Sequence, residues 1–398
     1  MSDGEEITAL KREVAARYGV PEPSVRVVRS PYRICPLGAH IDHQLGTVTA
    51  MAIDRAAHLA YAPADEPRVR LRSRDFTGEV DFPLDPVPPK RDGDWGNFAR
   101  GAVRALQEAG HALRRGLVGV TAGRLGEGGL SSSAAIGVAY LLALEEANGI
   151  AIPVDDNIAL DQAIENGYLG LRNGILDQSA ILLSKRDQLT VIDCKTLRHE
   201  LAPAGSGMPP FAILIPFSGL TQALVSTDYN RRVEECRSAA ATLLEAVGRP
   251  GEEPCLGNLS TAEYEAHQGS LTGAPGRRAA HFFTEMDRVG RGIQAWKAGD
   301  LSEVGRLMTA SGDSSIRQYE CGSLPLVDLY EILVSVEGVY GGRFSGAGFR
   351  GCCVALVDAE AAGQAADEVK ARYAARHPDL ASRAPVLVCR SADGARIL

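Results

Sequence analysis

The sequence lacks the long apolar stretch that a membrane-spanning helix requires. None of its 398 residues lies in an uninterrupted apolar run of 18, so we expect no contact with a membrane. The segment Met1 to Glu6 is acidic and has no apolar core, which is not the pattern of a secretory signal. Basic residues are fewer than acidic ones, 42 against 50, which gives a formal net charge of −8. This balance argues against nonspecific nucleic-acid binding, although a site for a small anion could still be locally positive.

Several common cysteine and phosphate-transfer motifs are also missing. The eight cysteines include no C-x-x-C pair. The adjacent Cys352 and Cys353 have poor geometry for a disulfide or for two zinc ligands, so we expect reduced, mostly buried thiols in a cytosolic enzyme. No Gly-Lys dipeptide occurs, which excludes a Walker A loop, and no His-Arg-Asp string of a protein-kinase catalytic loop is present. The sequence carries no signal for an oligomeric state.

The length of the chain predicts two domains. Residues 203–210, rich in proline and glycine, are typical of a linker, so we predict an N-terminal domain over residues 1–200 and a C-terminal domain over residues 201–398. Helical and strand periodicities are mixed in both halves, which indicates an α+β class. The predicted helices cover residues 5–18, 96–109, 132–148, 156–170, 229–247, 278–298, 300–310, 325–335 and 359–375. The predicted strands cover residues 25–27, 47–53, 57–62, 69–71, 189–193, 211–216, 353–357 and 386–389, with loops at 30–46 and 84–95.

The most specific motif is a glycine-rich string that leads into an apolar helical stretch. Residues 126–135 read Gly-Glu-Gly-Gly-Leu-Ser-Ser-Ser-Ala-Ala. Glycines let the backbone approach a ligand closely, and a helix start offers free N–H groups and a positive dipole end that suit phosphate. The hydroxyls of Ser131, Ser132 and Ser133 add donors, and one of them could hold magnesium. Serine caps at a helix start are the plainer alternative.

A second motif, Ser30-Pro-Tyr-Arg-Ile-Cys-Pro-Leu-Gly-Ala-His-Ile-Asp-His43, gathers polar side chains in a loop that proline and glycine punctuate. Arg33 could hold anionic oxygen, and His40 and Asp42 could form hydrogen bonds with sugar hydroxyls. His40, Asp42 and His43 could alternatively bind a metal, but their spacing does not match the common zinc patterns. A plain surface loop is disfavoured because apolar residues interrupt the segment.

A third motif resembles a nucleotide-binding fingerprint but stands in the wrong context. Gly346-Ala-Gly-Phe-Arg-Gly351 fits the pattern G-x-G-x-x-G. In dinucleotide-binding proteins that pattern opens a helix, whereas here it enters the apolar segment Cys353–Val357, which has the character of a strand. We therefore interpret the glycine-rich residues 338–351 as a loop that shapes an active site or as a tight hairpin.

Together, the three motifs, in this order and at these separations, resemble the GHMP kinase superfamily, and within it the galactokinases and, more closely, the galacturonokinases. The segments Ser30–His43, Glu165–Gln178 and Arg343–Cys353 carry the similarity, which extends over nearly the whole chain. The resemblance implies a two-domain α+β fold with the active site in the cleft between the domains. It also implies an enzyme that uses ATP and Mg2+ to phosphorylate the anomeric hydroxyl of a sugar acid, D-galacturonate. Phosphorylation of neutral D-galactose is the alternative, and a non-catalytic sugar sensor is less favoured because the motif residues are all present.

The resemblance also assigns roles to individual residues. It implies that Asp177 is the catalytic aspartate, that Arg33 beside it keeps it ionised, and that Glu165 holds Mg2+ with one serine of the run, Ser133. The implied sugar contacts are His40, Asp42, Gly174 and Tyr229. The implied ATP-binding residues are Gly128, Gly129, Leu130, Ser131, Ser132, Ser133 and Ala134, together with Trp95 near the adenine, for which packing at a helix start is an equal alternative.

Departures from the galactokinase pattern concern the choice of substrate. Galactokinases carry a glutamate that reaches the C6 hydroxyl of the sugar at the position of Ala39, and glycine at the positions of Tyr32 and Arg350. Arg172 is a further cation near Asp177. The loss of a carboxylate and the gain of arginines, which pair with carboxylates in a bidentate manner, favour a uronic acid. The sequence leaves open whether Arg172 or Arg350 faces the substrate or whether either forms only a surface ion pair.

Overall fold

Two β-sheets form the framework of the protein. The structure, a computed structural model, describes residues 3–123, 128–171, 173–220 and 229–398. The larger sheet has eight strands, with the order β12-β1-β2-β5-β3-β4 and with β6 and β7 continuing from β2. Its strands are β1 Arg26–Ile34, β2 Thr47–Ala64, β3 Arg68–Ser73, β4 Glu79–Pro83, β5 Gly116–Ala122, β6 Gln188–Asp193, β7 Arg198–Pro203 and β12 Arg396–Ile397. The smaller sheet has the order β11-β8-β10-β9 and consists of β8 Phe211–Pro216, β9 Val339–Phe344, β10 Cys353–Asp358 and β11 Val386–Cys389.

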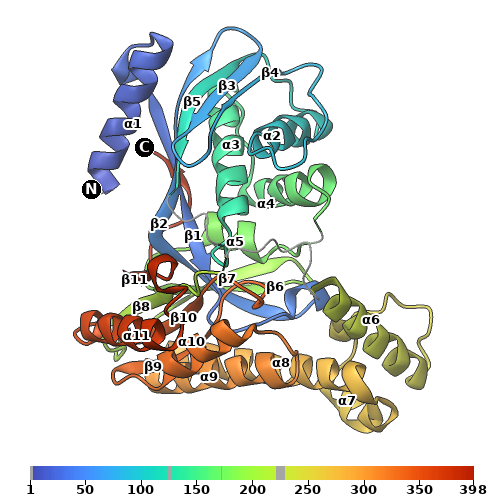
Figure 1. Cartoon of the computed structure of the whole chain (residues 1–398). Helices are drawn as coiled ribbons and strands as arrows, with labels where there is room; N and C mark the ends of the chain where they lie inside the picture. Colours follow the sequence, from blue (N-terminus) through green and yellow to red (C-terminus); the bar gives the residue numbers. More distant parts are fainter. Residues whose placement is uncertain (1–2, 124–127, 172, 221–228) are drawn as a thin grey trace.

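Helices cover both sheets (Figure 1). Around the larger sheet lie α1 Asp3–Tyr18, α2 Asn97–Glu108, α3 Ser132–Asn148, α4 Val154–Gln162 and α5 Leu176–Leu183. The later part of the chain forms α6 Tyr229–Ala246, α7 Thr261–His267, α8 Gly273–Ala298, α9 Leu301–Arg317, α10 Leu324–Val334 and α11 Ala362–Arg376. This mixture of helices with largely antiparallel sheets is the predicted α+β class. No helix within the described ranges is long and apolar enough to cross a membrane.

The period of two along β1 explains how the larger sheet is covered on two sides. Val27 belongs to a buried cluster with Leu10 and Val14 of α1, whereas its neighbour Val28 belongs to a cluster that includes Val103 of α2. Successive side chains of a strand point to opposite faces, so one strand serves both layers. Figure 1 accordingly shows α1 and α2–α4 on opposite sides of this sheet.

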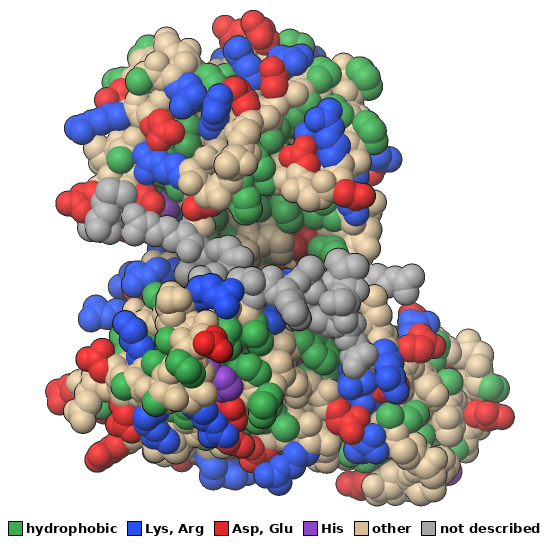
Figure 2. Space-filling model, in the orientation of Figure 1, with side chains coloured by type: hydrophobic (Ala, Val, Ile, Leu, Met, Phe, Trp, Pro, Cys, Tyr) green, Lys and Arg blue, Asp and Glu red, His purple; other side chains and the backbone are tan. Residues whose placement is uncertain are grey.

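The two sheets share one buried cluster. Ile34 of β1 and Val48 of β2 belong to the same cluster as Ile213 of β8 and Val354 of β10. Figure 2 shows the surface hollowed between the upper and lower parts of the molecule. The domain boundary at residues 200 and 201 falls inside β7, Arg198–Pro203, and stays a prediction.

Several predicted element boundaries were wrong. The strands predicted at 47–53 and 57–62 are one strand, β2, which continues because the polar residues between them lie on its more exposed stretch. The first part of the predicted loop 30–46 belongs to β1, where an irregularity in register between Pro31 and Arg33 accommodates the proline. The predicted helix 156–170 is α4 followed by a π-helix, Ala163–Tyr168. The glycine-rich segment 338–351 contains β9, and α5, α7, β4, β5, β7 and β12 were not predicted.

The cysteine side chains are in the predicted state. All eight are free and buried.

Candidate active site

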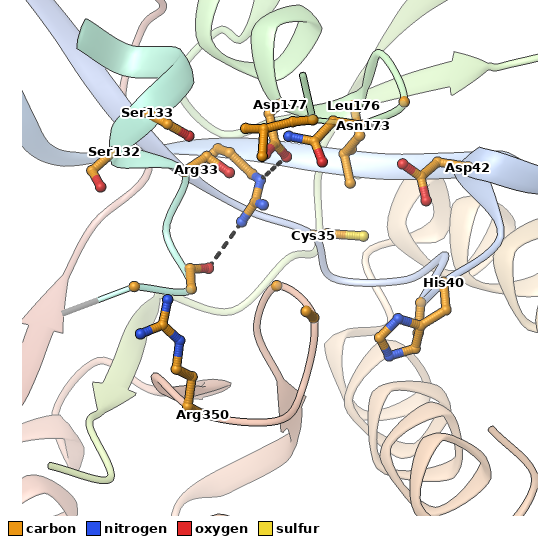
Figure 3. Close-up of a pocket in the computed structure, with 18 of the residues that line it drawn as sticks. Arg33, Cys35, His40, Asp42, Ser132, Ser133, Asn173, Leu176, Asp177 and Arg350 are labelled. Atoms are coloured by element: carbon orange, nitrogen blue, oxygen red, sulfur yellow. Dashed lines mark hydrogen bonds and ion pairs between the residues drawn. The ribbon is translucent and has the colours of Figure 1, made fainter. Parts of the chain in front are cut away.

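The three sequence motifs meet at one cavity. Its volume is about 740 Å3, and its walls come from the turn after β1, the loop before α3, the loop before α5 and the turn between β9 and β10. These segments are far apart in the sequence but adjacent in space (Figure 3). The arrangement brings a cationic and acidic pair, a row of serines and the side chains predicted to bind sugar to the same space.

Arg33 and Asp177 form an ion pair at the centre of this cavity. Arg33 Nε donates to Asp177 Oδ1 at 2.7 Å, and Arg33 Nη1 donates to the Gly129 carbonyl at 3.1 Å. The side chain of Arg33 is 5% exposed and that of Asp177 is 21% exposed. Burial acts to lower the pKa of Arg33, but the adjacent Asp177 carboxylate outweighs it and the pKa is raised. Asp177 lies in the first turn of α5, where the helix dipole also favours a negative charge.

The serine run begins α3 without capping it. Ser131 occupies the N-cap position with a φ of 57°, in the left-handed region, and its side chain makes no capping hydrogen bond. The buried Ser131 Oγ has no hydrogen-bond partner in the parts of the chain that the structure describes. Serine capping, the plainer alternative, is therefore not what this loop does. The start of α3 instead presents Ser132 and Ser133 to the cavity, as Figure 3 shows.

Glu165 lies buried beside the serines and Asp177. It belongs to the π-helix, and one of its oxygens, Oε2, accepts a hydrogen bond from Asn173 Nδ2 at 3.0 Å. The other oxygen, Oε1, is buried and has no partner among the described residues. Burial and the nearby charge of Asp177 raise the pKa of Glu165, and hydrogen bonds from Asn173 and Ser133 oppose the rise. A buried carboxylate with an open oxygen can bind a hard cation.

The other end of the cavity holds the predicted sugar-binding side chains. His40 stacks on Tyr319 with ring centroids 4.1 Å apart, and Cys321 Sγ lies 3.5 Å from its Nε2. Burial lowers the pKa of His40 well below its ordinary value, so the ring is neutral. At Gly174, an added Cβ would lie 2.5 Å from Asp42 Oδ2, so glycine is needed for Asp42 to reach this position. Ala39, His40, Asp42 and Gly174 all line the cavity.

The alternative prediction of a metal site at His40, Asp42 and His43 is not supported. No group of three or more His, Cys, Asp or Glu side chains in the described part of the chain could hold a metal ion. The imidazoles instead turn toward Tyr319, since His43 Nε2 lies 3.2 Å from the Tyr319 hydroxyl and His40 stacks on the same ring.

Some predicted site residues lie elsewhere. Tyr32 is buried in β1 and does not line the cavity, and its hydroxyl lies against Gly123. Trp95 precedes α2, donates from Nε1 to the Thr77 carbonyl at 3.2 Å and is likewise outside the lining. Leu130 and Ala134 are buried in the core beside the serine run.

Arg172 and the side chain of Tyr229 lie outside the described residues. The structure therefore does not test whether either side chain lines the cavity. The roles of Arg172, Tyr229, Tyr32 and Trp95 stay predictions.

Arg350 lines the cavity at the end that holds the serines. In Figure 3 it lies on the side of Ser132, away from His40 and Asp42. Partial burial lowers its pKa. This position suits a phosphate better than the far end of a sugar.

Sequence reasoning missed two residues of α8 that hold the backbone of Gly38 and Ala39, beside the predicted sugar-binding side chains. Glu285 Oε1 accepts from the backbone N–H groups of Gly38 and Ala39 at 2.8 and 2.9 Å, and His281 Nε2 lies 2.8 Å from the Ala39 carbonyl. Burial acts to raise the pKa of Glu285, but the charge of Arg288 is the chief cause that lowers it to about 2. Gly38 and Glu285 are 247 residues apart, and no local pattern connects them.

Comparison with known proteins agrees with this geometry. The description "GHMP kinases N terminal domain" matches residues 97–185, "GHMP kinases C terminal" matches residues 293–375, and "Galactokinase galactose-binding signature" matches residues 15–63. The chain belongs to the GHMP kinase family, as the motifs predicted. A galacturonokinase from Arabidopsis thaliana is 51% identical over 416 residues, covering 99% of this chain and 98% of that protein. A galactokinase from Roseiflexus sp. (strain RS-1) is 33% identical over 387 residues, covering 97% and 95%.

Solved structures share the same architecture. The galactokinase of Lactococcus lactis, determined in complex with galactose, superimposes with a TM-score of 0.89 at 29% identity and covers 98% of this chain and 99% of that one. The mevalonate kinase of Methanococcus jannaschii superimposes with a TM-score of 0.67 at 14% identity, covering 94% and 100%, which shows a common fold.

Proposed function

We propose that this protein is an ATP-dependent sugar kinase that converts D-galacturonate to D-galacturonate 1-phosphate. The observation that carries the proposal is the convergence of the Arg33–Asp177 pair, the serine run and the sugar-binding loop on one cavity, in a chain 51% identical to a galacturonokinase. Free, buried cysteines support a reducing compartment such as the cytosol.

The geometry supports different roles for different parts of the cavity: proton transfer at Asp177 and phosphate binding at the start of α3. The anomeric hydroxyl would lie next to Asp177, which accepts or orients its proton as the hydroxyl attacks the γ-phosphate of ATP. Arg33 fixes the Asp177 carboxylate through the 2.7 Å bond. The start of α3, with Ser132 and Ser133, would hold the phosphates with backbone N–H groups and hydroxyls, and Arg350 would add a positive charge on that side.

A magnesium site fits the residues beside the phosphates. Glu165 offers a buried oxygen without a protein partner, and Ser133 lies next to it. Two protein ligands suffice because Mg2+ keeps several waters and binds through phosphate oxygens of the nucleotide. Mg2+ held there would neutralise charge on the phosphates, and Glu165 and Ser133 would fix its position.

The choice of galacturonate rests on the sugar end of the cavity. Ala39 lines the cavity at the position where galactokinases carry a glutamate, so that glutamate's negative charge is absent beside a substrate carboxylate. Galactokinase activity is the second candidate, supported by 33% identity to a galactokinase and by the TM-score of 0.89 with a galactokinase that binds galactose.

A steady-state assay of ADP release, with ATP, Mg2+ and a panel of sugars, tests the proposal. We expect kcat/KM for D-galacturonate to exceed that for D-galactose by roughly ten- to a thousandfold. The product should lose its reducing end, because phosphate at C1 blocks the anomeric carbon, and 31P NMR should show an anomeric phosphate. Equal or better turnover of galactose would make the protein a galactokinase. No turnover of any sugar with ATP would reject the kinase proposal.

A further inference from the structure

Arg343 is a buried cation that faces the cavity. It lies near the end of β9, is 3% exposed and lines the cavity wall. Its Nη1 donates to the Cys35 carbonyl at 3.0 Å and its Nε donates to the Phe344 carbonyl at 3.1 Å. Within the described ranges, Nη2 donates to no protein group, and it is not among the polar atoms sealed from solvent. The guanidinium therefore has hydrogen-bond donors left for a ligand.

The charge of Arg343 has no acidic partner at ion-pair distance in the described parts of the chain. Glu285 is the nearby acid, but its oxygens are occupied: Oε1 also accepts from Ser311 Oγ at 2.7 Å, and Oε2 accepts from Arg288 Nε at 2.6 Å. His281 offers no negative charge. Arginine cannot give up its proton, and a buried charge without a counter-ion is costly. An anion that enters the cavity would remove this cost.

The position of Arg343 points to the sugar end rather than the phosphate end. Its Nη1 is bonded to Cys35, and Figure 3 places Cys35 between the Arg33–Asp177 pair and the end that holds Asp42 and His40. Arg343 also acts on the pKa of both His40 and Glu285, the acid that holds the backbone of Ala39.

We propose that Arg343 binds the carboxylate of the sugar acid and thereby selects it over the neutral sugar. This inference rests on the proposed function and names the residue responsible for its substrate class. Ala39 contributes by leaving the guanidinium unneutralised, since a glutamate at that position could pair with it. Arg350, on the side of Ser132, then serves the nucleotide and not the choice of sugar.

The sharpest test compares D-galacturonate with D-galacturonamide, which has a similar shape but no charge. The wild type should favour the acid by at least about tenfold in kcat/KM, because a charge-assisted bidentate pair is replaced by weaker contacts. Arg343→Gln should abolish this preference through a higher KM for the acid while changing the amide by less than about threefold. Arg343→Lys should keep part of the preference, because it retains the charge without the planar fork. Arg350→Gln is the matched control and should affect both sugars equally while raising the KM for ATP.

The outcomes separate this inference from the proposed function. If the wild type favours galacturonate and Arg343→Gln keeps the full preference, Arg343 is not the carboxylate-binding residue. If the wild type does not favour the acid over the amide at all, the proposal that D-galacturonate is the substrate is rejected, whatever Arg343 does.

Arg343 also holds two backbone carbonyls, so Arg343→Gln could unfold the protein, which its thermal unfolding midpoint would reveal. In that case Ala39→Glu and Ala39→Gln decide the matter, because they add similar bulk and only the first adds a charge that can neutralise Arg343. A preference for the acid lost in Ala39→Glu and largely kept in Ala39→Gln supports the inference. Equal effects of the two overturn it.

Discussion

Replacing Asp177 by asparagine tests the centre of the proposed mechanism. Asn keeps the size of the side chain and leaves an oxygen that can accept from Arg33 Nε, which now donates at 2.7 Å. It removes the negative charge and the ability to take a proton. We expect kcat to fall by about 10²–10⁴-fold, which corresponds to about 2.7–5.5 kcal/mol of transition-state stabilisation.

Binding and folding should survive this change. The sugar keeps its contacts at the end formed by His40, Asp42 and Gly174, so its dissociation constant, measured by calorimetry without nucleotide, should change by less than about threefold. Arg33 exchanges a charged acceptor for a neutral one and keeps its bond to the Gly129 carbonyl, so we expect a loss of about 1–2 kcal/mol in unfolding free energy.

The matched control is Asp155→Asn. Asp155 lies on α4 with its side chain 70% exposed, so the same chemical change there should leave kcat within about twofold. Asp177→Asn with kcat within about threefold of the wild type would refute the catalytic role. A large fall in kcat together with a comparable loss of sugar affinity would instead indicate a role in binding.

Three further predictions concern the metal, the substrate and pH. Glu165→Gln should raise the Mg2+ concentration needed for half-maximal rate at least about tenfold, and an unchanged magnesium titration would remove Glu165 from the metal site. Ala39→Glu should lower kcat/KM for galacturonate much more than for galactose, by roughly ten- to a thousandfold in the ratio, and a constant ratio in the coupled assay would contradict this. Burial is the main cause that lowers the pKa of His281 from 6.5 to about 4. Between these two values the unfolded chain binds a proton at His281 and the folded protein does not. The stability that His281 contributes should therefore be fully present above about pH 6.5 and fall by up to roughly 3 kcal/mol toward pH 4, in addition to the loss from other buried histidines such as His40. In thermal unfolding across this range, His281→Gln should make stability depend less steeply on pH.

Elements with strong periodicity were predictable from the sequence. The helix predicted at 132–148 is α3, Ser132–Asn148, and the strands predicted at 211–216 and 386–389 are β8 and β11. Each has an apolar pattern within its own residues that is sufficient to predict the element. The short helix α5, Leu176–Leu183, was missed because its eight residues directly follow a glycine-containing loop and give little periodic signal.

Site residues inside the motifs were predictable from the sequence, whereas the residues that hold them in position were not. Arg33 and Asp177 lie in segments whose composition is unusual, and the structure joins them directly. Glu285 looks like an ordinary acidic residue of a long helix, α8, and becomes a buried anchor only because the loop with Gly38 and Ala39 folds over it. Arg343 lies inside the segment Arg343–Cys353 that carries the family resemblance, but only the fold shows that no acid of the described residues lies at ion-pair distance from it.

Because every cysteine is buried, the reactivity of the thiols reports how far the folded structure opens. Burial raises the pKa of the Cys236 and Cys321 thiols to about 12, so they stay protonated and unreactive near neutral pH. An alkylating reagent should therefore label a molecule only as its structure opens, and the number of labelled sulfurs, read by mass spectrometry, should count how much has opened. Cys35 differs from the rest because it lines the cavity, so bound sugar and nucleotide should shield it directly and slow its labelling more than that of the other cysteines, which the ligands protect only by stabilising the fold. One chemical probe thus separates breathing of the cavity from unfolding of the whole chain.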